Sequence, residues 1–136
     1  MRAVLDTNIF VSALLVDTSP PAQILAFWRE GKFRLLTAAE QLDELARVTR
    51  YPRIRARLTP ALAGRLINEI RDVALLVGTL PLVERSPDPY DNYLLVLAEA
   101  GNADYLVTGD KTGLLALRDH HGTRIVTARD FSELRR

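Results

Sequence analysis

The sequence has 136 residues and a formal net charge of +1, with 48% of the residues hydrophobic and 26% charged. This balance predicts one globular domain over residues 1–136, and it excludes disordered and collagen-like chains. Cysteine is absent, which excludes disulfide frameworks, zinc ribbons, iron–sulfur sites and thiol nucleophiles. Asp6 interrupts the first apolar run, and no stretch approaches the roughly 18 apolar residues of a membrane span. We therefore expect an unprocessed cytoplasmic chain.

Short β-like runs alternate with longer helical ones in the first half of the chain. An apolar strand is predicted over 2–5, ending at Asp6, and Ser19 followed by two prolines opens a helix that ends near Gly31. A strand over 33–37 and a helix over 38–50 follow, and Tyr51-Pro52 stops that helix. From 60 to 77 apolar residues recur at steps of three and four, which predicts one long helix.

The same alternation continues in the second half. The remaining predicted elements are a weak strand over 80–83, a helix over 90–100 closed by Gly101-Asn102, a strand over 105–108, a short helix over 114–118, a strand over 124–127 and a helix over 128–135. Strands separated by helices pair in parallel through right-handed crossovers. The sequence therefore predicts an α/β fold, a three-layer α/β/α sandwich around a parallel sheet of about five strands.

Acidic residues gather at one rim of this predicted sheet. In open parallel sheets, ligands bind beyond the carboxyl ends of the strands. The acids placed there are Asp6 after the first strand, Glu44 on the helix after the second, Asp88 and Asp91 where the helix after 80–83 begins, and Asp110 after the strand over 105–108.

Each acid also has a purely structural explanation. Asp6, Asp88 and Asp110 could cap helices, Asp91 would suit a helix dipole, and Glu44 could pair with an arginine one turn away or face water. Together, however, converging carboxylates repel one another unless a cation neutralises them. Oxygen ligands without cysteine suit Mg²⁺ or Mn²⁺, whereas zinc prefers nitrogen and sulfur. The adjacent His120 and His121 stand beside Gly122, so we expect their rings to diverge along an exposed turn.

Four motifs carry a family likeness. They are Asp6-Thr7-Asn8 after the first strand, Glu44 in the second helix, Asp88-Pro89-Tyr90-Asp91-Asn92 at a helix start, and the run from Ala103 to Asp110 that ends in Thr-Gly-Asp. In this order they resemble the PIN-domain nucleases, and most of all the small prokaryotic members that are toxin components of toxin–antitoxin systems. The likeness extends to the run over 125–131 and so covers nearly the whole chain.

The resemblance implies an acidic quartet that holds one or two Mg²⁺ or Mn²⁺ ions, formed by Asp6, Glu44, Asp91 and Asp110. It also implies that Asn8 and Thr108 brace the quartet without adding charge, and that Asp88 is an accessory acid. Either Asp88 or Asp91 could approach the metal while the other caps the helix, and we favour Asp91.

The implied reaction is hydrolysis of RNA to products with a 5′ phosphate and a 3′ hydroxyl. A cation bound mainly by Asp6 and Asp110 would lower the pKa of a coordinated water and hold it in line with the phosphorus. The same ion, or a second one about 4 Å away, would stabilise the leaving oxygen. A covalent nucleophile is not needed, which suits a sequence without cysteine.

Partners are implied by the resemblance and by one basic segment. Residues 47–57 hold five arginines, among them the candidate RNA contacts Arg50, Arg53, Arg55 and Arg57. The alternative for this segment is a solvated helix end and loop. The resemblance also implies a homodimer and a small antitoxin protein that blocks the acidic pocket. Candidate surfaces for these partners are Phe10, Leu14, Leu15 and Trp28, although their helical spacing favours a place in the core.

Two other functions compete with this interpretation. A haloacid-dehalogenase-type phosphatase would need a second acid two residues after Asp6, where this chain has Asn8, and another acid soon after Asp110. The other alternative is a non-catalytic PIN-like scaffold that binds RNA. The full set of acids argues against it, because degenerate members lose one or more of them.

Overall fold

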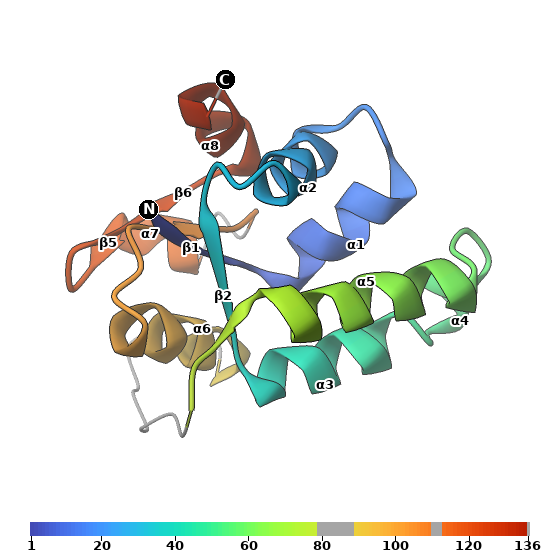
Figure 1. Cartoon of the computed structure of the whole chain (residues 1–136). Helices are drawn as coiled ribbons and strands as arrows, with labels where there is room; N and C mark the ends of the chain where they lie inside the picture. The colour runs from blue at the N-terminus through green and yellow to red at the C-terminus, as the bar shows by residue number, and fades with distance from the viewer. Residues whose placement is uncertain (79–88, 110–112, 136) are drawn as a thin grey trace.

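The computed structural model describes residues 1–78, 89–109 and 113–135, and it describes the side chains of all these residues except 89–91 and 135. Within them the chain forms one six-stranded sheet in the spatial order β3-β2-β1-β4-β6-β5 (Figure 1). The strands are β1 (Arg2–Leu5), β2 (Arg34–Thr37), β3 (Leu75–Leu76), β4 (Tyr105–Val107), β5 (Asp119–His120) and β6 (Thr123–Val126). All neighbouring strands are parallel except β5, which forms an antiparallel hairpin with β6.

The described part of the chain has eight helices, of which the first seven lie between strands and the last follows β6. They are α1 (Thr7–Leu15), α2 (Pro20–Arg29), α3 (Ala39–Val48), α4 (Pro52–Arg55), α5 (Pro60–Val73), α6 (Pro89–Ala100), α7 (Leu114–Leu117) and α8 (Ala128–Arg135). The side chains of Asp6, Ser19 and Thr59 accept backbone N–H bonds at the starts of α1, α2 and α5. These caps satisfy donors that have no partner inside a helix. The predicted α/β class is therefore confirmed.

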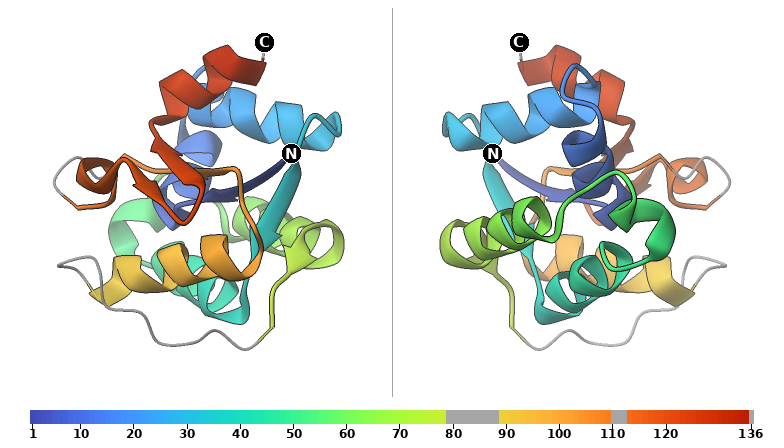
Figure 2. Two further views of the ribbon diagram at one scale, coloured as in Figure 1. Left: turned by 90° about the vertical axis from the view of Figure 1, so that its left-hand side faces the viewer. Right: turned by 90° about the vertical axis from the view of Figure 1, so that its right-hand side faces the viewer.

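Strand alternation divides the core into two layers. Leu5, Leu35 and Val107 point to one face, toward α1, α2, α3 and α5, whereas Val4 and Leu106 point to the other, toward α6. Figure 2 shows α2 and α8 on one side of the sheet and α6 on the opposite side. The predicted arrangement of helices on both faces of a parallel sheet thus follows from apolar residues on both faces of each strand.

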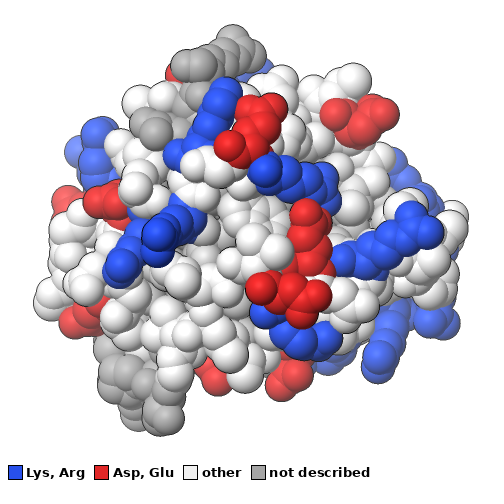
Figure 3. Space-filling view, viewed as in Figure 1, with Lys and Arg blue, Asp and Glu red and all other residues white. Residues whose placement is uncertain are grey.

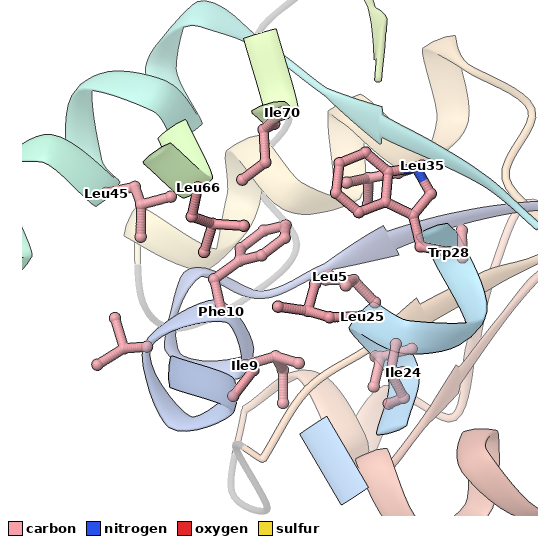
Figure 4. Packing of buried hydrophobic residues seen from close by; sticks show 14 of the residues in the cluster. Leu5, Ile9, Phe10, Ile24, Leu25, Trp28, Leu35, Leu45, Leu66 and Ile70 are labelled. Atoms are coloured by element: carbon pink, nitrogen blue, oxygen red, sulfur yellow. The ribbon is translucent and has the colours of Figure 1, made fainter. Parts of the chain in front are cut away.

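The larger core layer contains two residues that we considered for partner surfaces. Phe10 is fully buried and Trp28 is 6% exposed. Figure 4 shows the ring of Phe10 among Leu5 of β1 and Leu66 and Ile70 of α5. The core alternative is therefore correct for Phe10 and Trp28, which cannot form a partner surface. In the described residues no single helix could cross a membrane by length and apolarity, and the pair of α1 and α2 meets that test only with a bend of 100°.

The region after residue 60 differs from the prediction. The long helix ends at Val73 because Ala74 takes an extended conformation, and Leu75–Leu76 then pairs with β2. The Val77 N–H extends this ladder by donating to the Thr37 carbonyl at 2.9 Å. The helical spacing through Val77 was therefore misleading, because sheet pairing outweighs it. The predicted strand over 80–83 lies outside the described residues.

Candidate active site

The carboxylate of Asp6 lies at the carboxyl ends of two central strands. Its backbone N–H donates to the Val107 carbonyl at 2.9 Å, which continues the pairing of β1 with β4. The Thr108 hydroxyl, fully buried at the end of β4, donates to Asp6 Oδ2 at 2.8 Å. Two strands far apart in sequence therefore fix the position of this carboxylate.

Asp6 also caps the first helix. Its Oδ1 accepts the backbone N–H of Asn8 at 3.4 Å, while the side chain of Asn8 is exposed. The capping explanation and the site prediction are thus compatible for this acid, because the cap occupies one oxygen of the carboxylate and Thr108 approaches the other. Asn8 contributes its backbone here.

The carboxylate of Glu44 is held by hydroxyl groups from two other helices. The Thr7 hydroxyl of α1 donates to Glu44 Oε1, and the Tyr93 hydroxyl of α6 donates to the same oxygen at 2.8 Å. The two hydroxyl oxygens lie 3.2 Å apart. Glu44 is half-buried, so the alternative in which it points freely into water is not what the fold adopts. Both bonds reach Oε1, so these two hydroxyls leave Oε2 of Glu44 unoccupied.

Tyr93 connects the two acids electrostatically. Burial raises the pKa of its hydroxyl well above the usual value, and the negative charges of Glu44 and Asp6 raise it further, against a lowering by the Thr7 hydrogen bond. The phenol therefore remains a neutral donor at any ordinary pH. Because the hydroxyl of Thr7, the residue next to Asp6, donates to Glu44, the two acids lie near each other at this edge of the sheet.

A buried amide orients the helix that carries Glu44. Gln41 Nε2 donates to the Leu5 carbonyl at 2.5 Å, and Gln41 Oε1 accepts the Thr37 hydroxyl at 2.8 Å. Both Gln41 and Thr37 are 1% exposed. The ends of β1 and β2 are thereby joined to the first turn of α3, and Glu44 follows Gln41 by about one helical turn.

Sequence reasoning did not identify the supporting groups Thr7, Gln41 and Tyr93. Thr7 stands inside the Asp6-Thr7-Asn8 motif, and Gln41 and Tyr93 are polar residues next to apolar ones in helical segments, so a signal was present for each. Buried polar groups need hydrogen-bond partners, and that need points to such positions.

The remaining predicted acids are expected at the same edge from chain order alone. Asp88 and Asp110 lie outside the described residues, and Asp91 lies in the first turn of α6 with its side chain outside them. The described residues thus bring Asp6, Glu44 and Thr108 together and leave the other acids as predictions. The atoms that could bind a metal here are carboxylate oxygens, which neutral hydroxyl groups orient. Such oxygen ligands fit a hard divalent cation such as Mg²⁺ or Mn²⁺.

The arginine-rich segment begins in the last turn of α3, the helix that carries Glu44, and continues beyond it. Its five arginines are all exposed, and Arg50 and Arg55 line a hollow of about 220 Å³ together with residues of α3 and α5. Figure 3 shows basic side chains gathered at the right-hand end of the molecule, where α4 lies in Figure 1. The segment is not a plain loop, because Pro52 begins the short helix α4.

Comparison with known proteins gives the family. The model of the PIN domain family matches residues 2–112, a span that contains all four acids of the predicted quartet. An uncharacterized protein of Methanocaldococcus jannaschii is 27% identical over 122 residues, which are 89% of this chain and 77% of that protein. No solved structure matches the chain significantly. The chain therefore belongs to the PIN domain family, a superfamily of metal-dependent nucleases.

Proposed function

We propose that this protein is an endoribonuclease that depends on Mg²⁺ or Mn²⁺. The observation that carries the proposal is the pair of oriented carboxylates at the carboxyl edge of the sheet. Asp6 is held by the Thr108 hydroxyl and Glu44 by the hydroxyls of Thr7 and Tyr93. Membership of a family of nucleases supports the reaction class.

The acids Asp6, Glu44, Asp91 and Asp110 would hold the cation. When bound, the cation supplies activation of water and neutralises charge on the phosphate. The contribution of the surrounding residues is orientation: Thr108, Thr7 and Tyr93 donate neutral hydrogen bonds that fix each carboxylate without cancelling its charge. A carboxylate that is already oriented needs no reorganisation when the substrate arrives.

The RNA backbone is the substrate group that the basic segment fits. Arg50, Arg53, Arg55 and Arg57 are exposed and follow closely after α3, which carries Glu44. A guanidinium group can hold two phosphate oxygens at once, so these residues suit a sugar-phosphate backbone.

We further propose that the protein is the toxin of a toxin–antitoxin pair and forms a homodimer. The support for this role is the likeness of its motifs to those of small prokaryotic PIN toxins. The antitoxin would place a basic side chain into the acidic pocket and so replace the cation. A gene for a small DNA-binding protein directly upstream would support the toxin role, and an upstream region without such a gene would favour a housekeeping nuclease.

The proposed reaction is tested with Asp6→Asn, Glu44→Gln and the double variant, assayed on labelled single-stranded RNA with Mn²⁺. We expect each single variant to lose at least about a hundredfold in cleavage rate, because each removes a charge from the cation site. The matched control is Asp43→Asn, which neutralises an exposed acid next to Glu44 in the same helix. This control should cleave like the unmodified protein.

Two outcomes would contradict the proposal. Cleavage by the rigorously purified double variant would show that the acids do not carry the reaction. A thermal unfolding midpoint that Mn²⁺ raises, without cleavage of any RNA or single-stranded DNA, would point to a non-catalytic scaffold. A site that binds only the folded state stabilises it by about 2.7 kcal/mol at a hundred times its dissociation constant.

A further inference from the structure

A second group of side chains that could bind a metal lies at the β5–β6 hairpin, near the amino ends of the parallel strands. Glu99, near the end of α6, approaches His120 of β5 and His121 of the following turn. Glu99 Oε2 lies 3.2 Å from His120 Nε2, and Glu99 Oε1 lies 3.7 Å from His121 Nε2. One possible ligand atom from each residue lies within 4.8 Å of those of the other two. The expectation that the two histidine rings diverge is therefore wrong.

This group is separate from the candidate active site. Asp6 follows β1 at the carboxyl end of the parallel strands, whereas the β5–β6 hairpin turns at the amino end of β6, where Arg124 pairs with Tyr105. Glu99 follows Asp91 by eight residues on α6, which corresponds to about 12 Å along a helix. The acidic pocket and this cluster thus lie toward opposite ends of one helix.

The hairpin turn explains why the two histidines converge. His120 pairs with Thr123 across the hairpin, and the two residues between them, His121 and Gly122, have φ values of +48° and +85°. Two-residue turns with positive φ at both positions match the twist of paired strands. Here the turn brings the ring centroids of His120 and His121 to 4.5 Å from each other.

Hydrogen bonds join the hairpin that carries the two histidines to the end of α6, which carries Glu99. The ring of His120 is 2% exposed, and the hydroxyl of Thr123 donates to the Ala103 carbonyl at 2.7 Å. Ala103 comes directly after the turn that ends α6, and its N–H bonds the Ala98 carbonyl beside Glu99 at 2.8 Å. The hairpin and the end of α6 are therefore fixed relative to each other before any ligand arrives.

We propose that Glu99, His120 and His121 form a site for a first-row transition cation, with Zn²⁺ as the expected ion. Two imidazoles and one carboxylate are a known ligand set for zinc, and they leave one position open. Zinc bonds of about 2.0–2.1 Å in tetrahedral geometry place ligand atoms about 3.4 Å apart. The distances from His120 Nε2 to Glu99 Oε2 and from His121 Nε2 to Glu99 Oε1 are 3.2 and 3.7 Å, on both sides of that value, so each ring faces one oxygen of the carboxylate.

The composition of the chain allows metal binding at this site to be distinguished from binding elsewhere. His120 and His121 are the only histidines in the sequence, and cysteine is absent. Any bound metal with imidazole ligands must therefore sit at this cluster, whereas the acidic pocket offers oxygen.

The test measures Zn²⁺ binding to the full chain without an affinity tag, by calorimetry, and records the electron paramagnetic resonance spectrum of bound Cu²⁺. We expect nitrogen superhyperfine splitting from two imidazoles and a Zn²⁺ affinity that His121→Ala lowers at least about tenfold. His121 is exposed, so the metal-free variant should unfold at the same temperature as the parent. The matched control is Asp119→Asn, an exposed neighbour on β5 that should keep the affinity.

The Asp6→Asn and Glu44→Gln double variant distinguishes metal binding at this cluster from binding at the acidic pocket. It should keep the nitrogen-ligated Cu²⁺ signal. A Cu²⁺ spectrum with oxygen ligands only would overturn the proposal. Equal Zn²⁺ affinity in the parent and in His121→Ala would also overturn it, and the cluster would then be a hydrogen-bonded pair with a neighbouring ring.

Discussion

The carboxylate of Glu44 is held by hydrogen bonds from uncharged side chains. The phenol of Tyr93 and the hydroxyl of Thr7 both donate to Oε1, and the raised pKa keeps that phenol protonated. Neutral donors preserve the negative charge that a cation needs, whereas a lysine or arginine at the same place would compete with the cation. The same neighbours give a measurable dependence of stability on pH.

We expect the free energy of unfolding to fall as the pH rises above 10, in part because of Tyr93. The unfolded phenol ionises near the ordinary pKa of tyrosine, 10.0, whereas the folded phenol keeps its proton because burial raises its pKa. Above pH 10 the folded state thus binds more protons than the unfolded state, so stability is lost with rising pH and is fully present below that value. Urea unfolding measured from pH 8 to pH 11 follows this change.

Tyr93→Phe should make that fall shallower. The variant should also lose about 1–2 kcal/mol of stability at pH 8, because a hydrogen bond to a carboxylate is removed. Tyr51→Phe is the control, since it removes the hydroxyl of a tyrosine that is 43% exposed. An identical profile in the parent and in Tyr93→Phe would contradict the role given to burial of this phenol.

At the end of α6, Gly101 and Asn102 have different roles. Gly101-Asn102 is the predicted end, and the helix indeed ends at Ala100. The positive φ of +53° belongs to Asn102, not to the glycine. A Cβ on Gly101 would lie 2.6 Å from Leu36 Cδ1 and 3.2 Å from the Leu97 carbonyl oxygen, so the glycine allows the close approach of α6 to β2.

Gly101→Ala should therefore destabilise the protein by about 1–3 kcal/mol, because Leu36 is buried and must move to make room. Gly64→Ala is the matched control in α5, where a Cβ would meet nothing within 4 Å. That substitution should stabilise by about 0.5–1 kcal/mol, since alanine loses less backbone freedom on folding. Chemical unfolding of both variants measures the contrast, and equal effects would mean that α6 is not packed this closely on β2.

The molecule as a whole combines a small net charge of +1 with an uneven distribution of charge. Acidic groups lie at the carboxyl edge of the central strands, and exposed arginines follow the helix that holds Glu44. In the proposed function, these arginines would offset part of the repulsion between a phosphate backbone and the acids. Electrostatic binding of this kind weakens as salt rises, because counterions are released from the nucleic acid.

Neutralising Arg53, Arg55 and Arg57 to glutamine should reduce the salt dependence of RNA binding. Each lost phosphate contact lowers the slope of log K against log salt by about 0.7 for single strands, so the triple variant should lose about 2. The control changes Arg34, Arg71 and Arg129 to glutamine, which removes the same charge at exposed positions outside residues 47–57. Fluorescence anisotropy at several salt concentrations measures both slopes. An unchanged slope in the first variant would mean that residues 47–57 are a solvated surface that does not contact RNA.

The local pattern of the sequence was sufficient for the fold class and for the place of Asp6. Apolar strands that alternate with helices predict parallel pairing, and chain order alone puts Asp6 and Thr108 at the same sheet edge. The pattern failed at β3 and β5, because strands of two residues have no periodicity to read. Chain order placed the acids at this edge, but the choice of the quartet among them rested on the family likeness. Asp110 and the side chain of Asp91 lie outside what the structure describes.

Only the tertiary structure decided which neutral groups hold the acids and which rings meet. Thr7 and Tyr93 are 86 positions apart, and Glu99 lies 21 positions before His120, so neither contact follows from local spacing. Their hydrogen bonds form because packing on the two faces of the sheet brings α1, α3 and α6 together and leaves each buried polar group in need of a partner. Local sequence sets each helix and strand, whereas the contacts between them depend on how the whole core closes.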